Sequence, residues 1–159
     1  MCIRDSLGSC SHYTTSAGLV GGIRSVAIPT AENGTPEVDI AQQFTDSVSV
    51  AFQEDGRLRV VDEESADALL LLRLERLVDE LDDLRVSEAT EPYRFRLFAR
   101  ALLERASDGS ELLEIESLAG WGTYDAAQPD GDEEGRDQAV EAAMAMIIEE
   151  VVDRVTASW

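Results

Sequence analysis

The clearest pattern in the sequence is an alternation of apolar and polar residues that begins directly after Pro92. Between Tyr93 and Glu104 every second residue is apolar, and most of the residues between them are charged. A period of two over this length predicts a strand with one buried face. The predicted buried positions are Tyr93, Phe95, Leu97, Ala99, Ala101 and Leu103.

A turn and a returning strand are expected next. The sequence Ser107-Asp108-Gly109 favours a turn, and a three-residue loop ending in a left-handed Gly109 keeps both apolar faces on one side. The returning strand then presents Leu113, Ile115, Ala119 and Trp121 to the core. The predicted pairs are Leu103 with Leu113, Ala101 with Ile115, Phe95 with Trp121 and, on the open face, Arg100 with Glu116.

Two other segments have the three- and four-residue spacing of amphipathic helices. The first is expected to open near Thr35-Pro36 and to end at Asp55-Gly56, because proline suits a first helical turn and glycine a left-handed end. The second is expected from about 137 to 158. Short strands are predicted at 23–28 and 57–61. The apolar stripes are Ile40, Phe44, Val48, Ala51 and Phe52 in the first helix, and Val140, Met144, Ile147, Ile148, Val151 and Val155 in the second.

The segment 68–84 fits two patterns. Leucines at 70, 74, 77, 81 and 84 follow the spacing of a helix, in a segment of good helix formers. Read at period two, Leu70, Leu72 and Leu74 share one face of a strand. The pattern alone favours the helix, whereas a strand would produce a sheet covered on one side by two helices.

Charge narrows the range of possible functions. The 159 residues include 33 acidic and 13 basic side chains, all of the latter arginine, for a net charge of −20. The length suits one domain, and 44% hydrophobic residues suffice for a core. So negative a chain argues against general nucleic-acid binding and against simple electrostatic adhesion to an anionic membrane.

The two cysteines, Cys2 and Cys10, both precede the predicted domain. Leu7-Gly8-Ser9-Cys10 matches a bacterial lipobox, in which the cysteine after the cleavage site carries a lipid. The alternative is a free thiol in a disordered leader. Residues 1–6 lack the apolar stretch of a signal peptide, so we interpret 1–22 as a truncated signal and lipobox region followed by a flexible tether.

Motifs that would indicate an enzyme are missing from the sequence. Its single histidine, His12, lies in the predicted tether, which excludes a histidine-containing catalytic pair or metal site in the core. The sequence contains no glycine-rich phosphate loop. We therefore predict a protein that is not an enzyme and needs no cofactor.

One acidic segment approximates a calcium-binding loop. Asp130, Asp132, Glu134 and Glu141 are spaced roughly as the oxygen ligands of such a loop, with Gly135 at the turn. Glutamate at the third ligand position and the lack of a convincing entering helix count against it. The alternative is an acidic helix N-terminus, where carboxylates interact favourably with the helix dipole.

A second candidate site lies on the open face of the long strand. Arg94, Arg96, Phe98 and Arg100 alternate there, with Arg73 as a further candidate, and could contact the phosphates and acyl chains of an anionic lipid or a partner. The alternative is structural, because the predicted register supplies Glu116, and Glu114 nearby, as cross-strand partners for these arginines.

Several stretches together resemble the LPS-assembly lipoprotein family LptE. They are Leu7-Gly8-Ser9-Cys10, the strand 23–28 with Pro29, the turn Asn33-Gly34-Thr35, the segments 52–61 and 66–70, and the closing helix with Trp159. The resemblance implies that 68–78 is a strand, with a loop or hairpin tip from Asp79. It implies an α+β fold, a four- to five-stranded mixed or antiparallel sheet with two α-helices packed on one face, formed by a single domain over 23–159.

The same resemblance implies a function without catalysis. Family members are lipid-anchored at the periplasmic face of the outer membrane, where they plug the LptD β-barrel, aid its assembly and help to transport lipopolysaccharide. Cys10 would be the lipidated, palmitate-bearing residue, and LptD and lipopolysaccharide would be the partners. The alternative is a lipid-anchored periplasmic module that binds calcium or another protein and is unrelated to lipopolysaccharide.

Overall fold

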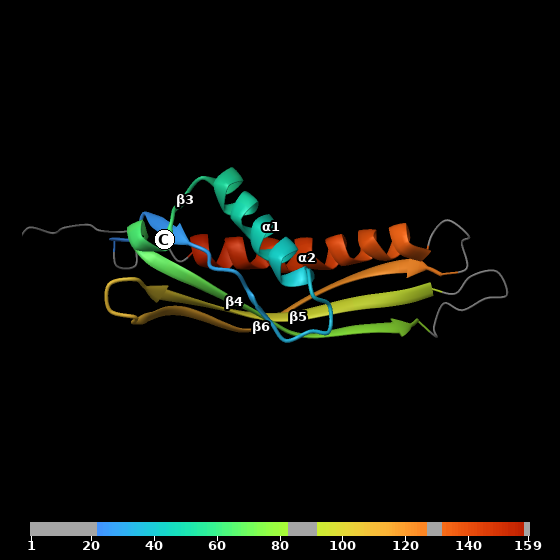
Figure 1. The fold of residues 1–159 in the computed structure, drawn as a ribbon. Coiled ribbons are helices and arrows are strands. Elements are labelled where there is room, and N and C mark those ends of the chain that lie inside the picture. Colours follow the sequence, from blue (N-terminus) through green and yellow to red (C-terminus); the bar gives the residue numbers. More distant parts are fainter. Residues whose placement is uncertain (1–21, 83–91, 127–131, 158–159) are drawn as a thin grey trace, which may run out of the picture.

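The structure is a computed structural model that describes residues 22–82, 92–126 and 132–157. Two helices lie together on one face of a sheet dominated by three long strands (Figure 1). The elements are β1 (Ser25–Ala27), β2 (Glu32–Asn33), α1 (Ile40–Asp55), β3 (Arg59–Val60), a 3₁₀ turn (Glu63–Ser65), β4 (Ala68–Leu81), β5 (Pro92–Arg105), β6 (Glu111–Asp125) and α2 (Asp132–Ala157).

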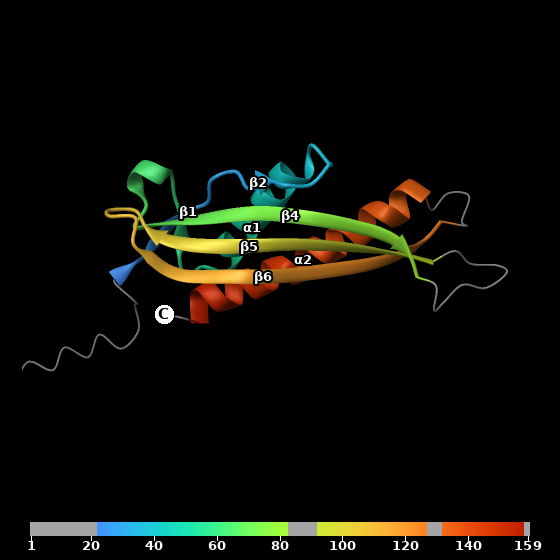
Figure 2. The same cartoon turned by 90° about the horizontal axis from the view of Figure 1, so that it is seen from below.

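The sheet is mixed, with the strand order β3-β1-β4-β5-β6. The short strands β1 and β2 run parallel to β4, whereas β4, β5 and β6 form an antiparallel meander. Seen from below, the three long strands lie in front of both helices (Figure 2), so this face of the sheet is open. The predicted fold class, an α+β sheet with two helices on one face, is confirmed.

The segment that fitted two patterns is a strand. Its residues Leu70, Leu72 and Leu74 are buried, as the period of two requires. The strand continues to Leu81, so the expectation of a loop from Asp79 is wrong: Asp79 and Glu80 pair with Phe95 and Arg94 of β5. Tertiary pairing thus overrides the helical spacing of the leucines.

Both helices pack their predicted apolar stripes against the core, but each begins at a different residue from the one predicted. Helix α1 starts at Ile40, because the preceding turn is held by Asn33, whose side-chain oxygen accepts a hydrogen bond from the Thr35 N–H at 2.9 Å. It ends as predicted at Gly56, which has a φ of 71° and donates its N–H to the Phe52 carbonyl. Helix α2 starts at Asp132, earlier than the expected 137.

The predicted hairpin register holds at two pairs and fails on either side of them. Next to the turn Glu104 pairs with Glu111 and the Arg105 N–H donates to the Ser110 carbonyl, so the loop is longer than the predicted three residues. Leu103 pairs with Leu113 and Ala101 with Ile115, as predicted, and Gly109 is left-handed. A bulge in β6 opposite Arg100 then inserts one extra residue, so Phe95 pairs with Gly122 rather than with Trp121. The phase reverses at this point. Ala119 and Trp121 consequently lie on the open face, and Leu118, Gly120 and Gly122 face the helices.

Helix α2 packs against β6 at very short range. A Cβ atom on Gly120 would lie 1.8 Å from the carbonyl oxygen of Ala143, and one on Gly122 would lie 2.3 Å from that of Ala139. The two alanines are one helical turn apart and are fully or almost fully buried. The helix backbone therefore rests directly on the strand backbone, at positions where only glycine leaves room.

Two polar clusters fix the ends of the sheet. The Asp67 carboxylate accepts hydrogen bonds from the backbone N–H groups of Arg24 and Ser25 and from the Ser25 hydroxyl, which lowers the pKa of Asp67. At the other end, Arg136 of α2 bonds Asp79 at 2.9 Å, and the Tyr124 hydroxyl donates to the same carboxylate at 3.0 Å. Burial, followed by the bond to Asp79, raises the pKa of Tyr124 to about 12.

The contact between α2 and β6 predicts a sharp contrast between two glycines. Gly120→Ala should destabilise the domain by about 3 kcal/mol, because its Cβ meets backbone rather than a movable side chain. Gly135→Ala, inside α2, should stabilise it by up to about 1 kcal/mol, because there the nearest atom is 3.4 Å away. Urea unfolding measures both changes, and equal effects would contradict the packing described.

Candidate binding surfaces

The open face of the sheet brings the predicted arginine cluster together. Arg94, Arg96, Phe98 and Arg100 occupy alternate positions of β5, all on the side away from the helices. Arg73 of β4 lies directly opposite Arg100, and Arg76 lies opposite Phe98. Five of the 13 arginines thus share one surface.

These arginines bind carboxylates, but not the predicted ones. Arg100 bonds Glu75 at 2.7 Å, Arg94 bonds Asp82 at 2.8 Å, and Arg96 is paired with Glu80. All three partners lie in β4 or directly after it. The register between β4 and β5 shifts between Leu74 and Arg76. Expecting Glu116 and Glu114 of β6 as partners was wrong, because the β6 bulge changes the register there and neither side chain makes an ion pair within the described ranges.

Aromatic rings complete the middle of this surface. The Arg76 guanidinium lies 3.8 Å from the centre of the Phe98 ring, and the Arg94 guanidinium lies 5.5 Å from that of Trp121. The Nε atoms of Arg94 and Arg96 are buried without a hydrogen-bond partner in the part of the chain described. Two of the five guanidinium groups on this face therefore lie within cation–π distance of an aromatic ring.

A hollow of about 400 Å³ lies at one edge of the open face. Pro29, Leu71 and Leu102 supply apolar walls, and Arg73 and Arg100 lie beside them. Arg73 is paired only loosely with Glu32, at 3.3 Å, and both arginine side chains are about half exposed, at 57% and 48%. An apolar hollow beside two guanidinium groups has the chemistry needed to hold an acyl chain next to a phosphate.

Sequence reasoning missed the apolar part of this hollow. Once 68–81 is read as a strand, the alternation places Leu71 beside Arg73 on the open face, and the antiparallel register brings Leu102 alongside Leu71. Pro29 reaches the hollow from a connecting segment. No local pattern in the sequence indicates that contact.

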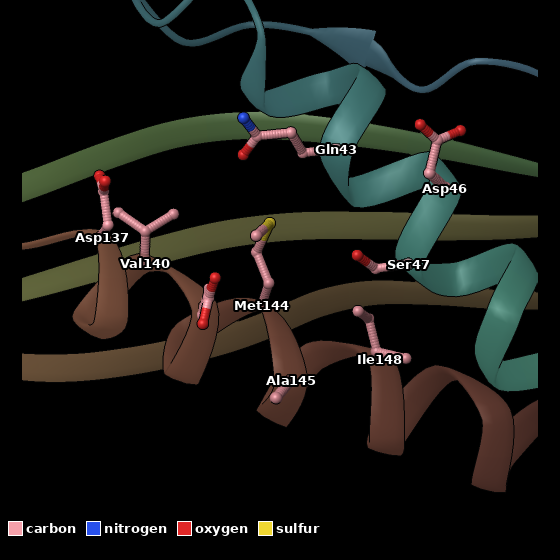
Figure 3. A pocket seen from close by; sticks show the side chains of 9 residues that line it. Gln43, Asp46, Ser47, Asp137, Val140, Met144, Ala145 and Ile148 are labelled. Carbon is pink, nitrogen blue, oxygen red and sulfur yellow. The ribbon is translucent and has the colours of Figure 1, made fainter. Parts of the chain in front are cut away.

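A second hollow, of about 590 Å³, lies between the helices (Figure 3). Val140, Met144 and Ile148 of α2 form its apolar floor, and Met144 points toward α1. Its rim carries three carboxylates and two uncharged polar side chains. They are Asp46, Asp137 and Glu141, together with Gln43 and Ser47.

The described members of the predicted calcium-ligand set lie along a helix rather than in a loop. Asp132 and Glu134 lie in the first turn of α2, and Glu141 follows about 10 Å farther along the helix axis. Asp130 lies outside the described residues, as does Cys10. Within the described ranges no group of three histidine, cysteine or acidic side chains is placed to hold a metal ion. The calcium site stays a prediction that this geometry does not support.

The fold and its surfaces define a class, a small α+β domain with a helical layer and an arginine-bearing open sheet. A profile of the LptE family, described as lipopolysaccharide-assembly, matches residues 23–155. The chain belongs to this family, whose role is lipopolysaccharide assembly rather than catalysis. No curated protein sequence matches the chain.

Solved structures share the fold at low sequence identity. A hypothetical protein from Chlamydia trachomatis is 11% identical with a TM-score of 0.63, over 86% of this chain and 97% of that one. A minor lipoprotein from Acinetobacter baumannii is 10% identical with a TM-score of 0.56, over 85% and 94%. Lipoprotein B from Nitrosomonas europaea is 16% identical with a TM-score of 0.52, over 85% and 83%.

Neither described helix is both long and apolar enough to cross a membrane.

The corrected register makes a fluorescence prediction. Trp121 is 49% exposed on the open face, whereas the register expected from the sequence would bury it. In a Trp159→Phe variant, Trp121 is the sole tryptophan. Neutral acrylamide should quench its emission efficiently in the folded protein, and unfolding in urea should increase the quenching only a little. If acrylamide quenches Trp121 only after unfolding, the side chain is buried in the folded protein, and the register predicted from the sequence would be correct.

Proposed function

We propose that this chain is an outer-membrane lipoprotein that plugs an LptD-type β-barrel, assists its assembly and helps transport lipopolysaccharide to the cell surface. The observation that carries the proposal is the LptE family match over residues 23–155, which spans nearly all the described domain. The fold shared with two solved lipoproteins is consistent with it. The role requires binding and positioning rather than catalysis, so no residue is assigned a catalytic part.

The anchor in this proposal is a lipid on Cys10. The lipobox Leu7-Gly8-Ser9-Cys10 would supply the cysteine, and the segment from 11 to 22, which is rich in Ser, Thr and Gly, would supply the tether. Its twelve residues would let the domain reach roughly 20 Å from the membrane surface on average, which permits entry into the lumen of a barrel seated in the same membrane.

Lipopolysaccharide would bind at the hollow beside Arg73 and Arg100. Leu71, Leu102 and Pro29 would contact an acyl chain, and the two guanidinium groups would contact a phosphate. Their present partners, Glu32 and Glu75, form exposed pairs worth about 0–1 kcal/mol each, so a phosphate can replace them. With a net charge of −20, the domain would need divalent cations to reduce repulsion of the glycolipid elsewhere.

The central test is purification of the native protein from its own membranes in mild detergent. The proposal predicts that a large LptD-type β-barrel is recovered with it in stoichiometric amount. Recovery of the protein without any such barrel would reject the plug function and favour the alternative, a periplasmic module unrelated to lipopolysaccharide.

A Cys10→Ser variant tests the anchor. It should lose palmitate labelling and membrane association, and labelling that persists would reject Cys10 as the anchor.

The hollow makes a separate prediction about lipid binding. Arg73→Ser with Arg100→Ser should weaken binding of lipopolysaccharide by about tenfold, because two phosphate contacts are lost. The matched control is Arg24→Ser with Arg59→Ser, which changes the net charge equally at two exposed arginines beside β1 and in β3. Binding is measured by titration with labelled lipopolysaccharide. Equal loss in both pairs would mean that only net charge matters and would exclude the hollow.

A further inference from the structure

The groove between α1 and α2 exists because α2 carries two apolar stripes and the second, although mostly buried, is not covered completely by α1. Ala143, Ile147 and Val151 face the sheet and are completely buried. The neighbouring stripe, Val140, Met144 and Ile148, keeps 7%, 5% and 9% of its surface exposed. Helix α1, with 16 residues against 26 in α2, crosses α2 at an angle and leaves these side chains as the floor of an open groove (Figure 3).

The rim of this groove carries negative charge that the domain itself does not neutralise. Asp137 and Glu141 make no ion pair within the described parts of the chain, and Asp46 accepts a hydrogen bond only from Gln42. Helix α1 contains no basic residue. The two arginines of α2 are engaged elsewhere: Arg136 with Glu37 and Asp79, and Arg154 with Glu150.

On the opposite face of the molecule, the open face of the sheet, carboxylates are paired with arginines. There Glu75, Glu80 and Asp82 each have an arginine partner on β5. Carboxylates are thus paired where the chain supplies cations and left unpaired around an apolar floor. An apolar groove with an uncompensated acidic rim is complementary to a ligand that has the opposite charge and apolar side chains of its own.

We propose that the α1–α2 groove is the docking site for a short, cationic, amphipathic segment of a partner protein. Two or three apolar side chains of that segment contact Val140, Met144 and Ile148, and flanking lysines or arginines pair with Asp46, Asp137 and Glu141. This is helix-in-groove recognition, with the anchors spaced by three or four residues. The inference rests on the groove alone and does not require the lipopolysaccharide function.

The length of the groove sets the length of the segment. Its α2 wall runs from Asp137 to Ile148, which corresponds to about 16 Å of helix. A bound helix of about three turns spans this distance. A second copy of the chain fits less well, because five of its arginines lie on the open face of the sheet rather than along an exposed helix that could enter the groove.

Methionine methyl groups provide a direct test. The chain has three methionines, of which Met144 lies on the groove floor and Met146, 41% exposed, points away from the core. The probe is a synthetic twelve-residue amphipathic peptide of leucine and lysine, with a leucine and glutamate peptide as its control. In methyl-¹³C-methionine NMR of the full chain, assigned with Met146→Leu, the lysine peptide should shift the Met144 signal saturably and leave Met146 unchanged.

Matched charge variants separate the groove from general attraction to an acidic protein. Asp46→Arg with Glu141→Arg should weaken binding about tenfold, whereas Glu149→Arg with Asp153→Arg, an equal change of charge on the exposed side of α2, should alter it less than twofold. If charge reversal impairs folding, Asp46→Asn with Glu141→Gln should still weaken binding.

Four results would overturn the inference. They are the absence of saturable binding, a shift at Met146 instead of Met144, equal weakening by both charge-reversal pairs, and a Met144 signal that changes with protein concentration alone, which would make a second copy the occupant.

Discussion

Helix α2 lies with its backbone directly on the backbone of β6, and the rest of the domain is arranged around this contact. Gly120 and Gly122 leave no side chain between the strand and the carbonyl groups of Ala143 and Ala139. The register of β6 decides that these glycines, and not Trp121, face the helix. Because α2 cannot approach this closely at any bulkier position, these glycines fix its place over β5 and β6, and α1 packs against α2 on the same side of the sheet.

This arrangement separates two surfaces of opposite character. The helices contribute eleven carboxylates and two arginines, whereas the open face of β4 and β5 holds five of the 13 arginines. The excess of acidic over basic side chains is therefore larger on the helical side of the domain than on the open face of the sheet. Each side has a hollow with its own chemistry. The hollow beside the arginines suits an anionic amphiphile, and the groove between the helices suits a cationic segment. The proposed lipopolysaccharide site and the proposed docking groove therefore lie on opposite faces of the sheet.

Part of the fold could be predicted from the sequence because one of its long strands, β5, alternates strictly. The alternation from Tyr93 to Leu103 placed β5 correctly, and Gly109 is left-handed in the turn as predicted, although the loop is longer than three residues. The bulge opposite Arg100 could not be predicted, since nothing local in Glu116-Ser117 distinguishes it from regular strand. That one residue reversed the predicted faces of Ala119 and Trp121 and removed Glu116 as the partner of Arg100.

The candidate sites were predicted less completely, for a related reason. The positions of Arg94, Arg96, Phe98 and Arg100 on one face follow from a period of two, and the structure places them so. Their ion-pair partners depend on the register with β4, and the two hollows depend on how separate elements meet. Those are properties of packing, and the sequence of a single segment does not contain them.

Hydrogen exchange of backbone amides tests the central contact most directly. If α2 and β6 are held together as described, the amides of Ala143 and Ile147 in α2 and of Gly120 in β6 should exchange only through global unfolding, with the same free energy as the core of β4 and β5. Exchange of the α2 amides with a free energy several kcal/mol below that of the sheet would show that the helix detaches on its own, and would contradict the account.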